Sequence, residues 1–360
     1  MELFNRFGLL SVILLATACE RQPTPVTIAN ESHGRAPELS GGFTWLNSPA
    51  VELAALRGKV VLLCFFDYSC AHSLRTLPCV RNWEQRYRKH GLVVVGVHVP
   101  QYEFAMHPNA VYAGVQRLGL SFPIVVDSNF AIADAYMSRA VPRLCLIDTR
   151  GAIRFDATGE GICAETERRL QQLLRELKPV ARFPEPLPST CATNPPVTPD
   201  LFLGRERGGL ANADATTTNA APEMFTLPWQ MTPEQVYAAG QWERHAEYLR
   251  HTRDVEELTD CVAVTYHGVA VNVVMKPEGI FWLQVFVQQD GQWLRREVAG
   301  PDIKFDERGR SLVEVRSARL YQLTANELPG LHELRLFVHG KGLSVYQFDF
   351  ATCKNPPGRD

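Results

Sequence analysis

One cysteine of this chain stands where an apolar strand should give way to a helix. The segment 65–73, Phe-Phe-Asp-Tyr-Ser-Cys-Ala-His-Ser, follows the apolar run 59–64. A buried strand that delivers a thiol to the first turn of a helix activates that thiol, because the positive end of the helix dipole stabilises the thiolate. We therefore expect any chemistry to start at Cys70.

Two residues next to Cys70 bear on its reactivity. An imidazolium at His72 would favour the thiolate a second time, and thiols activated in these ways have pKa values of about 3.5–7.5. We therefore expect a lowered pKa for Cys70, although His72 could equally be a solvated surface residue. Ser73 can donate a hydrogen bond to a thiolate but cannot form a disulfide. The alternative, a buried and inert Cys70, is disfavoured by its polar neighbours.

The elements around Cys70 alternate between strands and helices. The spacing of Leu77, Val80, Trp83 and Tyr87 predicts a helix directly after Cys70. Continuous apolar runs are typical of strands that are covered on both faces. Strands are expected over 59–66, 92–99, 123–126, 143–147 and 152–155, and further helices over 109–120, 130–137 and 165–177. This alternation predicts an α/β domain with a mixed sheet over residues 42–180.

A linker and a second domain follow. Six prolines between 184 and 199 and the polar stretch that ends at Glu223 predict a linker over residues 181–223. Residues 224–353 contain short runs of alternating apolar residues, two of which are joined by Asp290-Gly291, as in a hairpin turn. This pattern predicts an all-β, jelly-roll-like sandwich of antiparallel strands.

The first nineteen residues have the pattern of an export signal. Arg6 supplies a positive charge, the small or apolar run 8–18 is too short to span a bilayer, and small residues precede Cys19. The end of this segment resembles the lipobox of bacterial lipoproteins, which implies a lipid on Cys19; a plain signal peptide cut near Ala18 is the alternative. Residues 20–41 are then a tether to the periplasmic face of a membrane in the bacterial cell envelope.

Composition and charge exclude several classes of partner. The chain has 360 residues with 37 basic and 39 acidic side chains and a net charge of −2, so it offers no broad positive surface to nucleic acid. Its ten histidines show no paired metal-ligand spacing, and it has no glycine-rich phosphate loop. No metal or cofactor is therefore expected. Nine cysteines are typical of an oxidising compartment rather than a reducing one.

The first domain resembles thioredoxin-like proteins, and the chain after the tether resembles the soluble half of the DipZ family of thiol-disulfide proteins. The matching segments are 56–62, 68–70, 75–78, 91–98, 146–148, 198–204 and 319–323. The resemblance implies a thioredoxin fold followed by a β-sandwich similar to carbohydrate-binding modules. It also implies thiol-disulfide exchange with other proteins or small thiols, and a cis-proline at Pro142 that faces the cysteine.

Three positions differ from the pattern of that family. Its second redox cysteine is Ser73 here, its buried acid six residues before the nucleophile is Cys64, and its acid after residues 98–100 is Gln101. Without a resolving thiol on the same helix, Cys70 is expected to act through mixed disulfides that an external thiol resolves. The alternative is a binding or scaffold lipoprotein that has lost catalysis and binds a ligand, such as a carbohydrate, through its β-sandwich. Its candidates for stacking on a sugar are Trp242, Trp282 and Trp293.

The other cysteines are expected to be structural. Cys64 and Cys145 should lie buried on neighbouring strands of a thioredoxin sheet. A disulfide between Cys70 and Cys79 is disfavoured, because nine helical residues span about 13 Å, beyond the limit of about 7 Å between Cα atoms.

Three further cysteines lie in the linker and the second domain, namely Cys191, Cys261 and Cys353. They can supply one structural disulfide, for which Cys191 with Cys353 is the first choice. Connectivity itself does not follow from sequence.

Overall fold

Seven consecutive buried residues form β3 (Val60–Phe66), the central strand of the first domain. In this computed structural model, residues 27–29, 34–186, 197–214, 221–279 and 282–353 are described. Strand β3 pairs in parallel with β4 (Leu92–His98) and antiparallel with β6 (Arg143–Ile147). It is apolar throughout because helices or loops cover both faces of the sheet.

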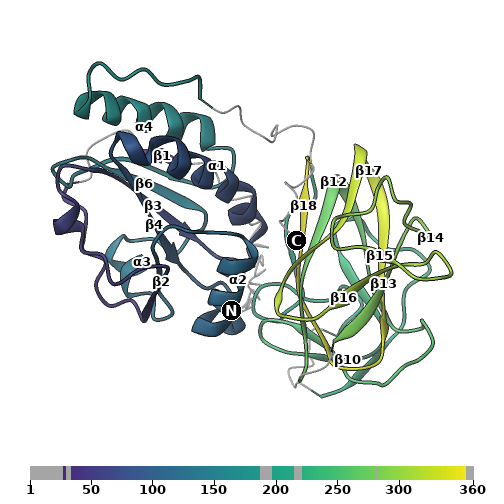
Figure 1. The fold of residues 1–360 in the computed structure, drawn as a ribbon. Helices are drawn as coiled ribbons and strands as arrows, with labels where there is room; N and C mark the ends of the chain where they lie inside the picture. Colours follow the sequence, from purple (N-terminus) through teal and green to yellow (C-terminus); the bar gives the residue numbers. More distant parts are fainter. Residues whose placement is uncertain (1–26, 30–33, 187–196, 215–220, 280–281, 354–360) are drawn as a thin grey trace, which may run out of the picture.

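The first sheet has seven strands in the order β1-β7-β6-β3-β4-β5-β2. The outer strands are β1 (Thr27–Ala29), β2 (Thr44–Leu46), β5 (Ile124–Val126) and β7 (Ile153–Thr158). The helices are α1 (Ala71–Tyr87), α2 (Pro108–Arg117), α3 (Ala131–Ala135) and α4 (Cys163–Leu177), with short 3₁₀ turns η1 (Leu53–Leu56), η2 (Arg88–His90) and η3 (Glu103–Met106). Helices α1, α2 and α4 share one hydrophobic core with one face of the sheet, and α3 packs on the other face (Figure 1). The predicted thioredoxin-like α/β fold is confirmed.

Parts of the predicted tether and linker belong to the domains. Strand β1 pairs with β7 along the sheet edge, and Ala36 and Leu39 are buried, so the tether over 20–41 is wrong for these residues. Within the predicted linker, β8 (Leu201–Phe202) pairs with β18 (Leu343–Ala351) of the second domain. Both segments are short, and their pairing partners lie far away in sequence, so local composition did not reveal them.

The second domain contains only β-strands among its described residues. Its strands form an antiparallel sheet in the order β15-β16-β13-β17-β12-β10-β11-β18-β8, with β14 on β13 and β9 on β10. The strands after β8 are β9 (Glu223–Phe225), β10 (Val236–Arg244), β11 (Leu249–His251), β12 (Cys261–Pro277), β13 (Leu283–Gln289), β14 (Gln292–Trp293), β15 (Lys304–Phe305), β16 (Ser311–Val315), β17 (Arg319–His339) and β18 (Leu343–Ala351). The predicted all-β second domain is confirmed.

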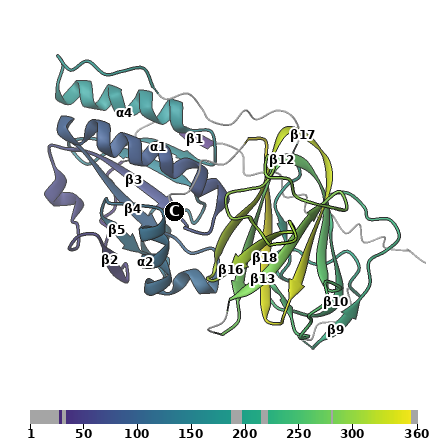
Figure 2. The same cartoon turned by 45° about the vertical axis from the view of Figure 1, so that its right-hand side comes forward.

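The two domains share a hydrophobic contact. Val274, Leu320 and Tyr346 of the second domain belong to the same buried cluster as the helix side of the first sheet. The ring of Tyr346 lies 5.0 Å from the rings of both Tyr102 and Phe104 in the first domain. Figure 2 shows the second domain against the end of the first that carries the start of α1. None of the helices among the described residues is long and apolar enough to cross a membrane.

Candidate active site

Cys70 occupies the N-cap position of α1, immediately after the loop that leaves β3. Its backbone N–H donates to the carbonyl of Asp67 at 3.2 Å, and its own carbonyl accepts the N–H of Leu74 at 3.0 Å. The first turn of α1 therefore begins at the thiol, as the sequence predicts. However, only 5% of the Cys70 surface is exposed.

Burial raises the pKa of Cys70, so the predicted lowering is wrong. The groups expected to favour the thiolate do act in that direction. The charge of His72 and hydrogen bonds from the backbone and hydroxyl of Ser73 lower the pKa of Cys70. The loss of water around the sulfur outweighs them, and the nearby carboxylate of Asp67 raises the pKa further. The burial of Cys70 does not follow from the residues next to it in the sequence, so the raised pKa was not predicted.

The loop before Cys70 is fixed by the buried carboxylate of Asp67. One oxygen accepts the N–H of Ser69 at 2.6 Å and the Ser69 hydroxyl at 2.7 Å. The other oxygen accepts the backbone N–H of Gln101 at 2.6 Å. At the position where the family pattern has an acidic side chain, Gln101 thus contributes a backbone hydrogen bond to Asp67. Asp67 holds the cysteine loop to the end of β4.

His72 lies among three carboxylates rather than on an open surface. Its Nδ1 is 2.8 Å from Glu160, and its Nε2 is 3.4 Å from Asp200 and 3.8 Å from Asp349. Burial alone would lower the pKa of His72, but hydrogen bonds to Asp200 and Glu160 and the charge of Asp349 raise it well above its ordinary value. The imidazolium is thus the favoured form, and two of its three partners come from the second domain.

Arg75 extends this cluster one helical turn further along α1. Its Nη1 and Nη2 donate to the two oxygens of Asp349 at 2.8 and 3.0 Å, and its Nε donates to Glu160 at 2.6 Å. Both Arg75 and Asp349 are buried, and Asn272 donates to Asp349 at 2.7 Å. Arg75 keeps the pKa of Asp349 low against the opposing effect of burial. This fork-shaped ion pair joins the two domains beside Cys70.

Sequence reasoning missed the roles of Arg75, Glu160, Asp200 and Asp349. The three-residue spacing of His72 and Arg75 on one helix face was the only signal for a shared partner. Their acidic partners lie 85 to 274 residues away from Arg75 in the sequence. Folding of the first domain brings Glu160 to His72 and Arg75. Docking of the second domain adds Asp200 and Asp349.

Comparisons with known proteins identify the family of the chain. Residues 36–156 match the AhpC/TSA family, and residues 198–351 match the family described as thioredoxin like C-terminal domain. The thiol-disulfide oxidoreductase YkuV of Bacillus subtilis is 31% identical over 141 residues, which cover 39% of this chain and 94% of YkuV. The chain belongs to the thioredoxin-like family of thiol-disulfide oxidoreductases. The resemblance inferred from the sequence is thereby confirmed.

Two further members of this family are similar to the chain. The thiol-disulfide oxidoreductase ResA of Halalkalibacterium halodurans is 32% identical over 155 residues, which cover 42% of this chain and 83% of ResA. Protein DipZ of Mycobacterium tuberculosis is 34% identical over 278 residues, which cover 75% of this chain. That match extends over both domains. The chain spans only 39% of the length of DipZ.

The proline expected to face the cysteine in this family is in the cis form. The Val141–Pro142 peptide bond is cis, and the Pro142 carbonyl accepts the N–H of Gly159 at 2.9 Å. Glu160, which contacts His72, is the next residue along the chain. Pro142 is therefore linked to the site through the loop that carries Glu160.

The side chains of His72, Asp200 and Asp349 also come close enough to hold a metal ion, with their ligand atoms within 4.8 Å of one another. The spacing of these three residues does not predict this grouping. The oxygens of Asp349 already accept from Arg75, and Gln347 donates to Asp200 at 2.7 Å. A bound cation would face the guanidinium, so we interpret the group as an ion-pair network.

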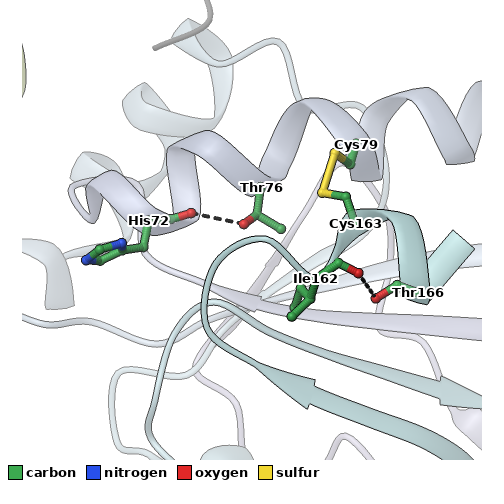
Figure 3. The surroundings of a disulfide bond; sticks show 6 residues. All are labelled: His72, Thr76, Cys79, Ile162, Cys163 and Thr166. Atoms are coloured by element: carbon green, nitrogen blue, oxygen red, sulfur yellow. Dashed lines mark hydrogen bonds between the residues drawn. A yellow bond between two sulfur atoms is a disulfide. The ribbon is translucent and has the colours of Figure 1, made fainter. Parts of the chain in front are cut away.

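The other cysteines follow the predictions in part. Cys64 and Cys145 are buried on the neighbouring strands β3 and β6, as predicted, and burial raises the pKa of Cys64 to about 12. The disulfide between Cys79 and Cys163 was not predicted (Figure 3). It joins α1 to the first residue of α4, two elements whose packing the sequence spacing does not reveal.

Two of the predicted cysteine sites involve residues that the structure does not describe. Cys353 is disulfide-bonded. Cys191 lies outside the described residues, so its pairing with Cys353 stays a prediction. Cys19 lies outside them as well. Cys261 is buried and free.

The three tryptophans of the sugar-stacking alternative differ in exposure. Trp242 is fully buried, and its indole N–H donates to the Ala239 carbonyl at 2.7 Å, so it belongs to the core. Trp293 is partly buried, with its ring 6.2 Å from that of Phe286. Trp282 is 47% exposed, and the guanidinium of Arg316 lies 4.9 Å from its ring centre. The three do not form a common stacking surface.

Proposed function

We propose that the chain is an exported thiol-disulfide exchange protein that acts through the single nucleophile Cys70. The observation that carries this proposal is the position of Cys70 at the N-cap of α1, hydrogen-bonded by Ser73 and next to the charge of His72. Family membership makes disulfides or thiols of proteins or small molecules the expected substrates. No cofactor is needed, because the electrons pass between sulfur atoms.

The exchange has two steps. The Cys70 thiolate attacks one sulfur of a partner disulfide, a mixed disulfide forms, and the other partner sulfur leaves as a thiolate. A second, external thiolate then attacks the mixed disulfide and releases Cys70, because residue 73 is serine. The two steps together free one partner thiolate and leave the other partner sulfur in a disulfide with the external thiol. Attack by a further external thiolate on that disulfide completes the two-electron reduction of the partner and releases the external disulfide. Ser73 stabilises the Cys70 thiolate when it leaves again.

Access to Cys70 requires the domains to move apart at their contact. Cys70 is almost fully covered, and Tyr102 next to it donates a hydrogen bond to Gln347 of the second domain. The Arg75–Asp349 ion pair closes the same contact. A partner disulfide that widens this contact would expose the thiol and remove two carboxylates from His72. The docked form is then the resting form.

The pattern of the first nineteen residues supports action in the cell envelope. A lipid on Cys19 would anchor the protein to the periplasmic face of a bacterial membrane. Replacing Cys19 with Ala should release the full chain into the soluble fraction of the cell envelope. Cys191→Ala is a matched control that leaves membrane attachment unchanged. Retention of the Cys19→Ala chain on membranes would contradict lipid anchoring.

Alkylation kinetics test the nucleophile. The rate at which iodoacetamide modifies Cys70 is measured by mass spectrometry from pH 5 to pH 10, with buried Cys64 as an internal control. We expect Cys70 to react faster than Cys64 and to form a mixed disulfide with glutathione supplied as its disulfide. Cys70→Ser should abolish the mixed disulfide. If Cys70 reacts no faster than Cys64 and traps no glutathione, the chain is the binding or scaffold protein instead.

A further inference from the structure

The Cys79–Cys163 disulfide lies on the same side of α1 as His72. Cys79 is in the middle of α1, and Cys163 is the first residue of α4 (Figure 3). The carbonyl of His72 accepts the Thr76 hydroxyl at 3.0 Å, one turn before Cys79. The carbonyl of Ile162 accepts the Thr166 hydroxyl at 2.8 Å on the other partner helix. Both sulfurs are therefore carried by well-ordered helical turns.

The segment directly before Cys163 carries Glu160 to the site. Glu160 stands between Gly159 and Gly161, whose φ angles are +102° and +79°. Only glycine adopts such angles without strain, and glycine gives up more conformational freedom on folding than any other residue. The segment thus has little conformational preference of its own for the observed geometry. Contacts with the rest of the domain must therefore hold residues 159–161 in place.

Two ties hold this segment, one at each end. At the start, Gly159 donates to the Pro142 carbonyl at 2.9 Å. At the end, the disulfide fixes Cys163 to α1, the helix that carries His72 and Arg75. Glu160 reaches back from between these ties to His72 at 2.8 Å and Arg75 at 2.6 Å.

We propose that the Cys79–Cys163 disulfide is a positioning bond for the Cys70 site, because it holds Glu160 against His72 and Arg75. This inference rests on the proposed role of Cys70 as nucleophile. The bond takes no part in the exchange itself, and both of its sulfurs are buried. It acts by keeping one carboxylate on the imidazolium beside the thiol.

The charges around His72 give this bond a measurable effect. The groups that face His72 are Glu160, Arg75, Asp200, Asp349 and the Cys70 thiol. With the disulfide broken, the hydrogen bond between Glu160 and His72 Nδ1 is formed less of the time, and the pKa of His72 falls. Asp200 and Asp349 still keep part of the rise in that pKa. A neutral His72 no longer favours the Cys70 thiolate.

The experiment compares three variants of the full chain. The double variant Cys79→Ala/Cys163→Ala removes the bond, Glu160→Gln removes the carboxylate charge, and Leu170→Ala destabilises α4 at a buried site away from Glu160. The His72 titration is followed by proton NMR, with its signal assigned by its absence from His72→Asn. We expect the first two variants to lower the His72 midpoint by about one pH unit, as for loss of one close opposite charge, and Leu170→Ala to leave it unchanged.

The outcomes separate this inference from the proposed function. If Glu160→Gln lowers the midpoint and the double variant does not, the disulfide does not position Glu160, and the inference is overturned. An equal shift in Leu170→Ala would also overturn it, since any loss of stability would then have the same effect. Failure of Cys70 to form a mixed disulfide in the wild-type chain refutes the proposed function without affecting the titration. Should the double variant not fold, Cys79→Val/Cys163→Ala refills the space and is measured instead.

Discussion

Replacing Asp349 with Asn should loosen the domain contact and expose Cys70. The substitution removes the charge that faces the buried guanidinium of Arg75. Loss of one partner from a buried ion pair costs about 3–5 kcal/mol. Because Glu160 still accepts from Arg75 Nε, we take the lower end, about 3 kcal/mol. At 1.4 kcal/mol per factor of ten, this raises the population of separated domains about 100-fold.

The rate of Cys70 alkylation at pH 7 measures this population, since the thiol is covered when the domains are docked. We expect an increase of about 100-fold for Asp349→Asn, as long as the separated form stays rare. Asp134→Asn is a matched control, because it removes a carboxylate from an ion pair with Arg139 that is exposed on both sides. It should leave the rate unchanged. An unchanged rate for Asp349→Asn would show that the Arg75–Asp349 pair does not guard the thiol.

Three further predictions follow from the same geometry. The pKa of His72 is raised, so the charged imidazole stabilises docking fully below the ordinary His pKa of about 6.5, and this stabilisation is lost as pH rises through the raised pKa. The rate of Cys70 alkylation should therefore increase from pH 6 to pH 9 more steeply than the thiolate fraction of Cys70. A rate that only follows the thiolate fraction would contradict the role of His72 in docking. Ser73→Cys should allow a disulfide with Cys70, detected as the loss of two alkylatable thiols under oxidising conditions, and two persistent free thiols would count against the geometry. Gly114→Ala should lower the free energy of unfolding in urea by about 1–3 kcal/mol, because its Cβ would come within 2.6 Å of the Tyr68 ring, whereas a gain of up to about 1 kcal/mol would mean that helix propensity prevails.

Local patterns in the sequence were enough to predict the fold and the position of Cys70 at the start of a helix. The run 60–66 is apolar at every position because β3 is covered on both faces, and Cys70 follows it at the start of a helix. The cis form of Pro142 came from resemblance, since periodicity and composition do not encode it. These features depend on neighbours in sequence or on a shared family pattern.

The environment of the thiol could not be predicted in this way. The direction of the Cys70 pKa shift depends on burial by groups that are not adjacent in sequence. Arg75 finds Asp349 across 274 residues, and Cys79 finds Cys163 across 84. Each of these pairs forms only after α1 has packed against α4 or against the second domain. Helix periodicity places Arg75 and Cys79 on a face of α1, but it does not identify the residues that pack against that face.

Two features restrain the chemistry of Cys70, and they act on different steps. The serine at position 73 removes internal resolution, so it affects only the second step of an exchange. Burial of Cys70 bears on the first step, because it removes water from the thiol and raises its pKa. An ordinary thiol is only ~3% thiolate at pH 7, and each further unit of pKa lowers that fraction about tenfold. In the exchange that we propose, burial therefore limits the attack by Cys70, and the serine at position 73 leaves resolution to an external thiol.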